Sequence, residues 1–402
     1  MIPFADFTFF GVLIYPAIPT IAAGLSAAPA RLYRPWLLLV TAGMAILVYS
    51  ATAPLLPEAP AREIWVIAAF FALEYAVARS LLWQVAESKL DPARAVLAPG
   101  RFAFPVAVVL ALAPLAIAKF VPLAIPGSFA GFLGISYVTF RALDVIFCIR
   151  DGLISELPVG QYFAYLFFFA TVSAGPIDRY RRFEADWRHS RTREEFLHDL
   201  DAAVHKLFVG LGYKFILAAL IQRYWLEPAG AGAGILNTVS YMYAYSFYLF
   251  FDFAGYSAFA IGVSYLFGIH TPENFNRPFL ARDIADFWNR WHITLSWWLR
   301  DHVYMRFVLA ARKQGWIVDR HTASYAGFAL SFGLMGLWHG TAAHYLLYGF
   351  YHAALMIGHE AFGRWNKRHR VWGEGPAWTV AGTAITFQAV CFGFLLFSGR
   401  LG

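Results

Sequence analysis

Charged residues are scarce in this sequence. Only 14% of its 402 residues are Asp, Glu, Lys or Arg, where a soluble domain has about 25%. The apolar share is 59% and the mean hydropathy is +0.53, so a soluble globule of this length would lack the polar side chains to cover its surface. The same apolar content excludes an intrinsically disordered chain. The composition therefore predicts a polytopic membrane protein.

Cysteine is almost absent. Cys148 and Cys391 lie in apolar stretches, which excludes a disulfide framework and a CxxC metal site. The sequence has no HExxH motif, P-loop, dinucleotide fingerprint or GxSxG elbow in a convincing context. We therefore expect no metal and no bound cofactor. The amino terminus lacks a basic segment and a small-residue cleavage signal, so we interpret its first apolar run as a retained span rather than a signal peptide.

The charge that is present is basic, with a formal net value of +7. In so apolar a chain, Lys and Arg more often mark cytoplasmic loops and contacts with anionic lipid headgroups than nucleic-acid binding, and we expect no nucleic-acid partner. Polar islands lie at 178–201, 277–320 and 364–370. The first is nearly charge-balanced, whereas the second is more basic. The positive-inside rule places such loops in the cytoplasm.

Apolar runs long enough to cross a bilayer recur along the whole chain, since a helix needs about 20 residues to do so. We expect about ten or eleven membrane-spanning or re-entrant segments in a single domain, 1–402, without internal repeats. The run at 234–268 is too long for one span and contains Asp252, so we interpret it as two pieces or a broken helix. The candidate spans are 8–29, 35–56, 64–84, 102–125, 128–149, 159–177, 204–226, 234–268, 324–346, 345–362 and 376–398.

Apolar residues recur at helical spacing within the second island, between 284 and 298. A Trp-rich stripe on a short helix between charged ends fits an interfacial or re-entrant element. An ordinary buried helix is the equally good alternative. The stripe consists of Ile284, Phe287, Trp288, Trp291, Leu295 and Trp298.

His339 is a titratable residue inside a candidate span, between Gly336 and Gly340. Such a residue usually faces a cavity or a partner, and burial keeps its ring neutral, the form that a general base needs. The glycines would let a substrate or another backbone approach closely. From these residues alone, a structural histidine and a catalytic one both remain open.

The other polar candidates have simpler interpretations. His292 alone is more often a surface or headgroup histidine than a functional one. His352 and His359 are seven residues apart beside Glu360, but no recognised ligand motif accompanies them, so a metal centre is disfavoured. For Asp252 we favour a structural role, in which it accepts hydrogen bonds from backbone, Tyr or Arg.

Five motifs, in this order and spacing, resemble the core of the membrane-bound O-acyltransferase (MBOAT) family. They are FFDFAGYS at 250–257, PENFNRPF at 272–279, DFWNRWH at 286–292, WLRD at 298–301 and LWHG at 337–340. The resemblance covers nearly the whole chain. It favours a catalytic His339, with His292 as the second histidine of the family, positioning a substrate or lining a tunnel.

Two bacterial branches of this family are candidates. One transfers D-alanyl groups for teichoic-acid D-alanylation, and the other acetylates polysaccharides of the alginate type. The segments ISYVTF at 135–140, TVSAGPIDRY at 171–180 and YMRF at 304–307 resemble the first branch. The second usually carries a Gly-Gly-Asn stretch at the last place, which is absent here. The resemblance therefore favours D-alanyl transfer, with acetyl transfer as the alternative.

The resemblance implies an all-α helical bundle around a central funnel in a bacterial cytoplasmic (inner) membrane, with His339 at the base of the funnel. It also implies a carrier protein on the cytoplasmic side that presents D-alanine as a phosphopantetheine thioester, and an acceptor on the outer side. A small membrane partner is a further expectation. We expect the carrier to dock on Arg306, Arg312 and Lys313, because complementary charge speeds encounter.

The same resemblance assigns supporting roles around the two histidines. Tunnel-lining or structural residues are expected at Asp252, Asn274, Asn276, Trp288, Arg290, Trp291, Trp338 and Gly340. A proton-coupled transporter that uses the intramembrane His and Asp residues is a third hypothesis. It is disfavoured because such proteins usually show repeats or paired broken helices in matching halves.

Overall fold

The computed structural model describes residues 3–5, 7–26, 30–51, 60–90, 100–125 and 131–401. Within these residues the chain is helical, and its only β-type pairing is an isolated bridge between Phe275 and Trp291. The chain divides into two compact units, residues 1–208 with 258–272 and residues 209–257 with 273–402. Helix α12 (Ile235–Leu266) belongs to the second unit up to Ser257 and to the first from Ala258.

Seven described helical segments are long and apolar enough to cross a membrane. This confirms the prediction of an all-α polytopic membrane protein. The ends of three predicted spans, at 27–29, 52–56 and 128–130, lie outside the described residues. The seven segments are Phe7–Leu25, Leu32–Tyr49, Ile64–Glu87, Phe102–Ala124, Arg193–Ala231, Ile235–Leu266 and Pro376–Phe397.

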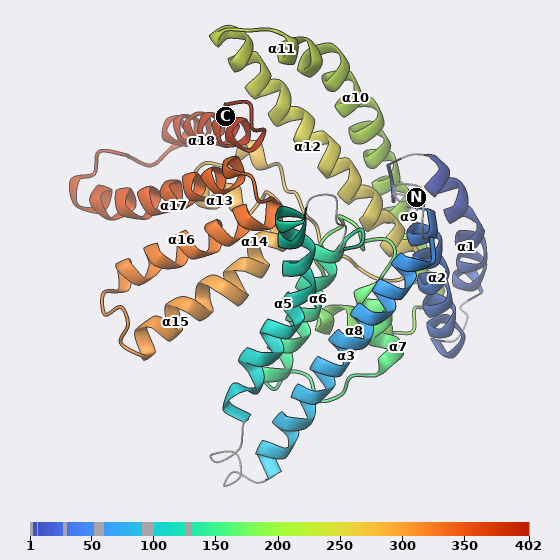
Figure 1. Ribbon diagram of the computed structural model, residues 1–402. Coiled ribbons are helices and arrows are strands. Elements are labelled where there is room, and N and C mark those ends of the chain that lie inside the picture. The colour runs from blue at the N-terminus through green and yellow to red at the C-terminus, as the bar shows by residue number, and fades with distance from the viewer. Residues whose placement is uncertain are drawn as a thin grey trace. The chain divides into compact units, whose positions relative to one another are not determined.

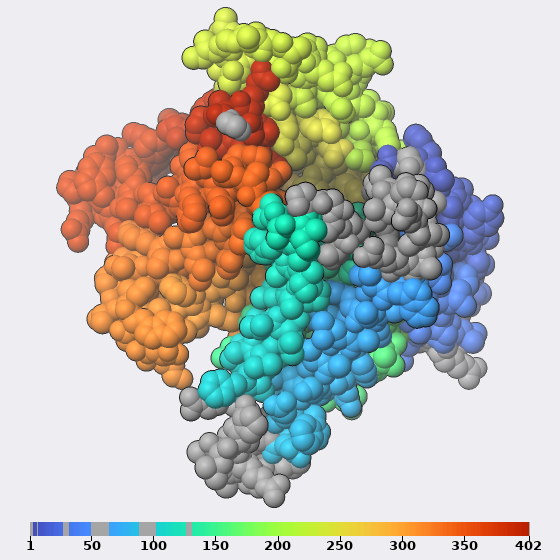
Figure 2. Space-filling model, in the orientation of Figure 1, coloured from blue at the N-terminus to red at the C-terminus, as the bar shows by residue number. Residues whose placement is uncertain are grey.

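In the first unit α3 (Pro60–Leu90), α5 (Gly100–Ala124) and α6 (Ile135–Arg150) pack on one another, and α6 is almost entirely buried. In Figure 1, α3 and α5 lie side by side with α6, and Figure 2 shows α3 and α5 together on the surface in blue and cyan. The helices of this unit are α1 (Phe7–Leu25), α2 (Ala30–Ala51), α3 (Pro60–Leu90), α5 (Gly100–Ala124), α6 (Ile135–Arg150), α7 (Val159–Leu166), α8 (Tyr180–Arg188) and α9 (Arg193–Gly210, all but its last two residues).

The predicted span at 159–177 is wrong. The helix there, α7, ends at Leu166 and has only 8 residues. The buried Arg141 of α6 explains the ending, because its guanidinium donates hydrogen bonds to the backbone oxygens of Tyr165, Leu166 and Thr171. These carbonyls are therefore satisfied without a continuing helix, as burial requires.

The predicted break in the run at 234–268 is also wrong, since α12 is one continuous helix of 32 residues. Its glycines are sites of close helix packing. A Cβ at Gly255 would lie 2.7 Å from the backbone nitrogen of Lys214, and a Cβ at Gly262 would lie 2.9 Å from the backbone oxygen of Ala203. Asp252 is accommodated by an ion pair with Lys214.

The first polar island joins the loop after α12 through a network of ion pairs in the first unit. His270 donates from both ring nitrogens when protonated, to Asp186 at 3.2 Å and to Asp199 at 2.9 Å. These two hydrogen bonds, assisted by the carboxylate charges, outweigh burial and raise the pKa of His270 to about 9. Arg182 binds Asp186 and also the backbone oxygen of His270. The loop is thereby fastened to α8 and α9.

In the second unit the helices α15, α16, α17 and α18 follow one another side by side (Figure 1). Helix α16 begins at an Asp319 N-cap, whose carboxylate accepts a hydrogen bond from the backbone nitrogen of Thr322 at 2.7 Å. The elements of this unit are η2 (Leu211–Ala218), α10 (Ala219–Ile221), η3 (Gln222–Leu226), α11 (Glu227–Ala231), most of α12, η4 (Pro278–Leu280), α13 (Ile284–Trp288), α14 (Ile293–Leu299), η5 (Arg300–Tyr304), α15 (Met305–Lys313), α16 (Arg320–His339), α17 (Ala343–His369) and α18 (Pro376–Phe397).

Candidate active site

The Trp-rich stripe forms two short helices, α13 and α14, rather than one. Asp283 caps α13, accepting a hydrogen bond from the backbone nitrogen of Asp286 at 2.8 Å. The helix ends at Trp288, and the chain turns at His292, whose φ of 43° is left-handed. All six stripe side chains are buried in the second unit, which agrees with the buried alternative. The turn between the helices therefore carries a histidine into the protein interior.

Asn274 holds this turn in place. Its side-chain oxygen accepts a hydrogen bond from the hydroxyl of Thr294 at 2.7 Å, and its backbone oxygen accepts one from the nitrogen of Ile293 at 3.0 Å. Its amide nitrogen donates to the hydroxyl of Ser257 at 3.3 Å. Asn274 itself is fully buried. The contacts of Asn274 fix the first residues of α14, directly after His292.

His292 and His339 line one cavity of about 60 Å³. His339 is the last residue of α16, whereas His292 lies in the turn directly before α14, so different elements of the second unit supply the two histidines. The cavity is otherwise apolar and rich in aromatic rings. Its remaining lining residues are Leu249, Phe253, Trp288, Trp291, Leu295, Met335, Tyr348, Phe394 and Phe397.

The two histidines differ in their surroundings. His292 is 4% exposed, packs on the ring of Phe253 at 4.9 Å, and has no hydrogen-bond partner for either ring nitrogen among the described residues. His339 is half-buried and packs against the rings of Trp338 at 4.6 Å and Phe397 at 4.8 Å. Burial among apolar rings disfavours a charged imidazolium. Such surroundings suit a neutral imidazole that takes up a proton only during a reaction.

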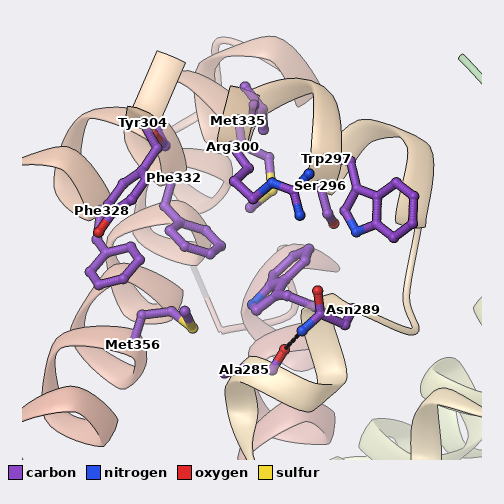
Figure 3. Close-up of a pocket in the computed structure, with 13 residues that line it drawn as sticks. Ala285, Asn289, Ser296, Trp297, Arg300, Tyr304, Phe328, Phe332, Met335 and Met356 are labelled. Atoms are coloured by element: carbon purple, nitrogen blue, oxygen red, sulfur yellow. Dashed lines mark hydrogen bonds between the residues drawn. The ribbon is translucent and has the colours of Figure 1, made fainter. Parts of the chain in front are cut away.

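A second, larger cavity of about 240 Å³ shares two of these walls, Trp288 and Met335. Figure 3 shows Phe328, Phe332 and Met356 on one side of this cavity and Trp297 on the other, with Arg300 and Ser296 near its rim. It is lined along its length by α13, α14, η5, α16 and α17. The cavity of the histidines therefore has a neighbouring space, bounded partly by the same side chains.

Several predicted site residues support the cavity without lining it. Asn276 and Arg290 exchange backbone and side-chain hydrogen bonds beside the Phe275–Trp291 bridge. Trp338 packs on the rings of both histidines. A Cβ at Gly340 would lie 2.3 Å from the ring of Tyr345, so this glycine admits a neighbouring side chain.

Asp252 does not line either cavity. Its carboxylate binds the ammonium of Lys214, which lies in η2, whereas we expected backbone, Tyr or Arg as its partner. The predicted structural role agrees with this ion pair. Lys214 was missed from the sequence, because its position in an apolar run gave no signal of the residue that it faces.

The lining residues Tyr348, Phe394 and Phe397 were also missed. Phe394 and Phe397 are three residues apart on α18, a spacing that places both on one helix face. That face could have been noticed, but only the packing of α17 and α18 brings it to the histidines.

The candidate docking residues lie on α15, which Figure 2 shows on the surface in light orange. Arg312 and Lys313 are exposed, whereas Arg306 is half-buried. Met305 and Leu309 on the same helix are apolar and exposed.

The described residues contain no group of three or more His, Cys, Asp or Glu side chains that could hold a metal ion. His352 is fully buried among aromatic rings, whereas Glu360 accepts hydrogen bonds from His321 and Ser324. His359 approaches Asp283 at 4.0 Å. The side chains of His352, His359 and Glu360, which were considered for a metal, therefore contact different partners.

Comparison with known proteins places the chain among acyltransferases. The family model described as MBOAT, membrane-bound O-acyltransferase family, matches residues 135–377. The whole chain is 40% identical to the teichoic acid D-alanyltransferase of Bacillus subtilis (strain 168) and covers 98% of that protein. It is 43% identical to the enzyme of the same name from Lacticaseibacillus rhamnosus, over 74% of this chain and 76% of the relative.

A more distant likeness is to a probable alginate O-acetylase of Pseudomonas aeruginosa, 30% identical over 66% of this chain and 48% of that protein. The match to the family model spans every element that lines the two cavities except α18, of which it reaches only the first two residues. The chain therefore belongs to the membrane-bound O-acyltransferase family, and it is a membrane-embedded acyltransferase.

Proposed function

We propose that this enzyme transfers D-alanine from a phosphopantetheine thioester on a carrier protein to a hydroxyl acceptor, for D-alanylation of a cell-envelope polymer of the teichoic-acid type. The carrier stands on the cytoplasmic side of the inner membrane and the acceptor on the outer side. The first acceptor is a hydroxyl group of the polymer itself or of a small membrane partner. The observation that carries the proposal is the cavity shared by His292 and His339 in a chain that aligns end to end with a D-alanyltransferase.

The extent of similarity favours D-alanyl over acetyl transfer. The likeness to the alginate O-acetylase relatives covers about half of their length, whereas that to the Bacillus subtilis D-alanyltransferase covers 98% of its length. The cavity volume of about 60 Å³ is compatible with either short acyl group, since one water occupies about 10–15 Å³ on the same measure. A long fatty acyl chain would not fit.

The proposed chemistry assigns the proton to His339. Its neutral imidazole takes the proton of the acceptor hydroxyl as the oxygen attacks the thioester carbonyl. A carbon–oxygen bond forms, the carbon–sulfur bond breaks, and the imidazolium returns the proton to the leaving thiolate. His292 positions the acyl group or the acceptor within the same cavity. No metal or bound cofactor enters these steps.

The larger cavity suits the pantetheine arm. It adjoins the cavity of the histidines through Trp288 and Met335 and is lined by Tyr304, the residue before α15. A carrier protein that docks on α15 would therefore lie beside the part of the larger cavity that Tyr304 lines. The exposed Met305 and Leu309 offer apolar contact, while Arg312 and Lys313 attract an acidic partner.

The ester content of the host envelope tests the proposal. Mild alkali releases ester-linked groups, which are identified in cells that carry the wild type, His339→Ala or the control His369→Ala. His369 is an exposed histidine at the end of α17, and its variant should behave as the wild type. We expect D-alanine to be lost only in His339→Ala, at equal membrane abundance. Loss of acetate instead would move the enzyme to the polysaccharide-acetylating branch.

A further inference from the structure

The acyl group of the proposed function carries a positive charge that an acetyl group lacks. The α-amino group of a D-alanyl thioester can bear a proton, and a charge taken into an apolar cavity needs a compensating partner. This inference rests on the proposed function, because it concerns how the same cavity recognises that acyl group.

The cavity offers no carboxylate for such a partner. None of its eleven lining residues is Asp or Glu. Asp252, next to the lining residue Phe253, is engaged in the ion pair with Lys214 and does not line the cavity. A neutral histidine can accept one hydrogen bond from the ammonium, but it carries no negative charge to compensate the cation.

What the cavity does offer is aromatic rings, which make up six of the eleven lining residues. They come from four helices and from the turn before α14, and they pack closely. The centroids of Trp291 and Phe394 are 4.7 Å apart, and those of Tyr348 and Phe397 are 5.1 Å apart. Ring faces attract cations through their quadrupole, and this attraction is strongest where water is excluded.

We propose that the aromatic wall formed by Trp291, Tyr348, Phe394 and Phe397 recognises the α-ammonium of the D-alanyl group by cation–π contact. These rings thereby select a small cationic acyl group over a neutral one of the same size. The selecting side chains lie on α17, α18 and the turn before α14. Two of them contact the proposed base directly, since the ring of His339 packs on those of Tyr348 and Phe397.

The experiment compares two acyl groups on the same carrier protein. D-alanyl and isobutyryl have the same number of non-hydrogen atoms, but only the first has an amino group. Transfer of each is measured with the full-length enzyme in proteoliposomes for the wild type, Phe394→Leu and Phe397→Leu. Phe392→Leu is the matched control, since Phe392 lies on the same helix, is 41% exposed and does not line the cavity.

We expect each lining variant to lower the D-alanyl-to-isobutyryl ratio of kcat/KM by about 2- to 30-fold, the range of one cation–π contact. The control should keep the wild-type ratio. Because both substrates are measured on one preparation, the ratio does not depend on how much of a variant is folded. Equal loss of both activities would overturn the aromatic recognition but leave the proposed function intact. A wild-type enzyme that transfers isobutyryl and no D-alanine would overturn the proposed function itself.

Discussion

The backbone of His292 shows how single residues shape the site. A φ of 43° is uncommon for a residue with a side chain, and here it lets α13 end and α14 begin with the imidazole pointing into the cavity. The contacts of Asn274 with Ile293 and Thr294 hold the following helix start in this conformation. The strained backbone of His292 is therefore held in place by the hydrogen bonds of Asn274.

Thr294→Val should weaken the support of the turn at His292, because it removes the hydroxyl that donates to the buried oxygen of Asn274. We expect a loss of about 0.5–1.5 kcal/mol in unfolding free energy, together with reduced transfer, because the oxygen keeps only the longer bond from the backbone nitrogen of Thr294 at 3.4 Å. Thr294→Ser keeps the hydroxyl and should stay close to the wild type. Thermal unfolding in detergent compares the three proteins. Equal melting temperatures for Val and Ser variants would show that the hydrogen bond does not support the turn.

The sequence anticipated the site residues better than their partners. His292, His339, Trp288 and Trp291 were all named from motifs, and the structure brings these four to one cavity. The contribution of α18 was not predictable, because Phe394 lies in an apolar span whose aromatic residues look like any lipid-facing ones. Long-range packing decides which of them face the cavity.

At the scale of helices, α16 and α17 owe their close packing to glycine. A Cβ at Gly336 would lie 2.4 Å from the backbone oxygen of Tyr345, and one at Gly349 would lie 2.3 Å from that of Phe332. Small residues that let helix backbones approach closely are a common basis of packing in membranes. Close approach at Gly336, by a substrate or by another backbone, was predicted from the sequence, and the neighbour is backbone.

Gly349→Ala should therefore separate α16 from α17 and displace His339 at the end of α16. We expect a lower melting temperature and lower transfer activity, because a methyl group cannot fit at 2.3 Å from a carbonyl oxygen. Gly358→Ala on α17, where nothing lies within 4 Å of the added Cβ, is the control. That control should be neutral or slightly stabilising, since Ala favours a helix by about 1 kcal/mol over Gly. A Gly349→Ala protein as stable as the control would contradict this account of the packing.

The loop after α12 should respond to alkaline pH. The folded state holds the proton of His270 more tightly than the unfolded chain, since the pKa rises from 6.5 to about 9. Its stabilisation is thus complete below about pH 6.5 and is lost as the pH rises through about 9. The effect is modest because 42% of the side chain is exposed.

Melting temperatures of the wild type and His270→Gln between pH 6 and 10 measure this contribution. The wild type should lose stability between about pH 6.5 and pH 9, and the variant should show a flatter profile. Parallel profiles for the two proteins would mean that the ion pairs with Asp186 and Asp199 do not fasten the loop.

The helices that were predicted correctly are those that apolar composition determines. The predictions that failed concern places where a single side-chain contact determines the structure. The apolar runs correctly indicated the helices α1, α2, α3, α5, α12 and α18. The failed span at 159–177 depends on one guanidinium, that of Arg141, which satisfies the carbonyls where α7 ends. The absence of a break in α12 likewise depends on Lys214, which neutralises Asp252. Neither partner is visible in a local sequence window.

At the scale of the whole molecule, membership in the MBOAT family makes the chain an acyltransferase and removes the transporter hypothesis. The proposed carrier adds a partner surface on α15, where basic and apolar side chains are exposed together. Complementary charge on such a surface acts mainly on the rate of encounter.

Charge reversal at Arg312 and Lys313 should therefore weaken the use of the loaded carrier. We expect the apparent KM for the carrier to rise about tenfold or more at low salt, with a smaller change in kcat, because like charges repel an acidic partner. Steady-state transfer at several carrier concentrations measures this. Arg368→Glu, at the exposed end of α17, is the control. An unchanged KM in the double variant would exclude this face of α15 as the docking site.

The most direct test of the central claim is reconstituted transfer from a carrier loaded with radiolabelled D-alanine or acetate. Wild type and His339→Ala are placed in proteoliposomes with a hydroxyl acceptor, and label in the alkali-labile product is counted. We expect D-alanyl transfer by the wild type and at least about 100-fold less by His339→Ala, the lower bound for losing a general base. Wild-type rates in the folded His339→Ala enzyme would contradict the assignment of the catalytic base.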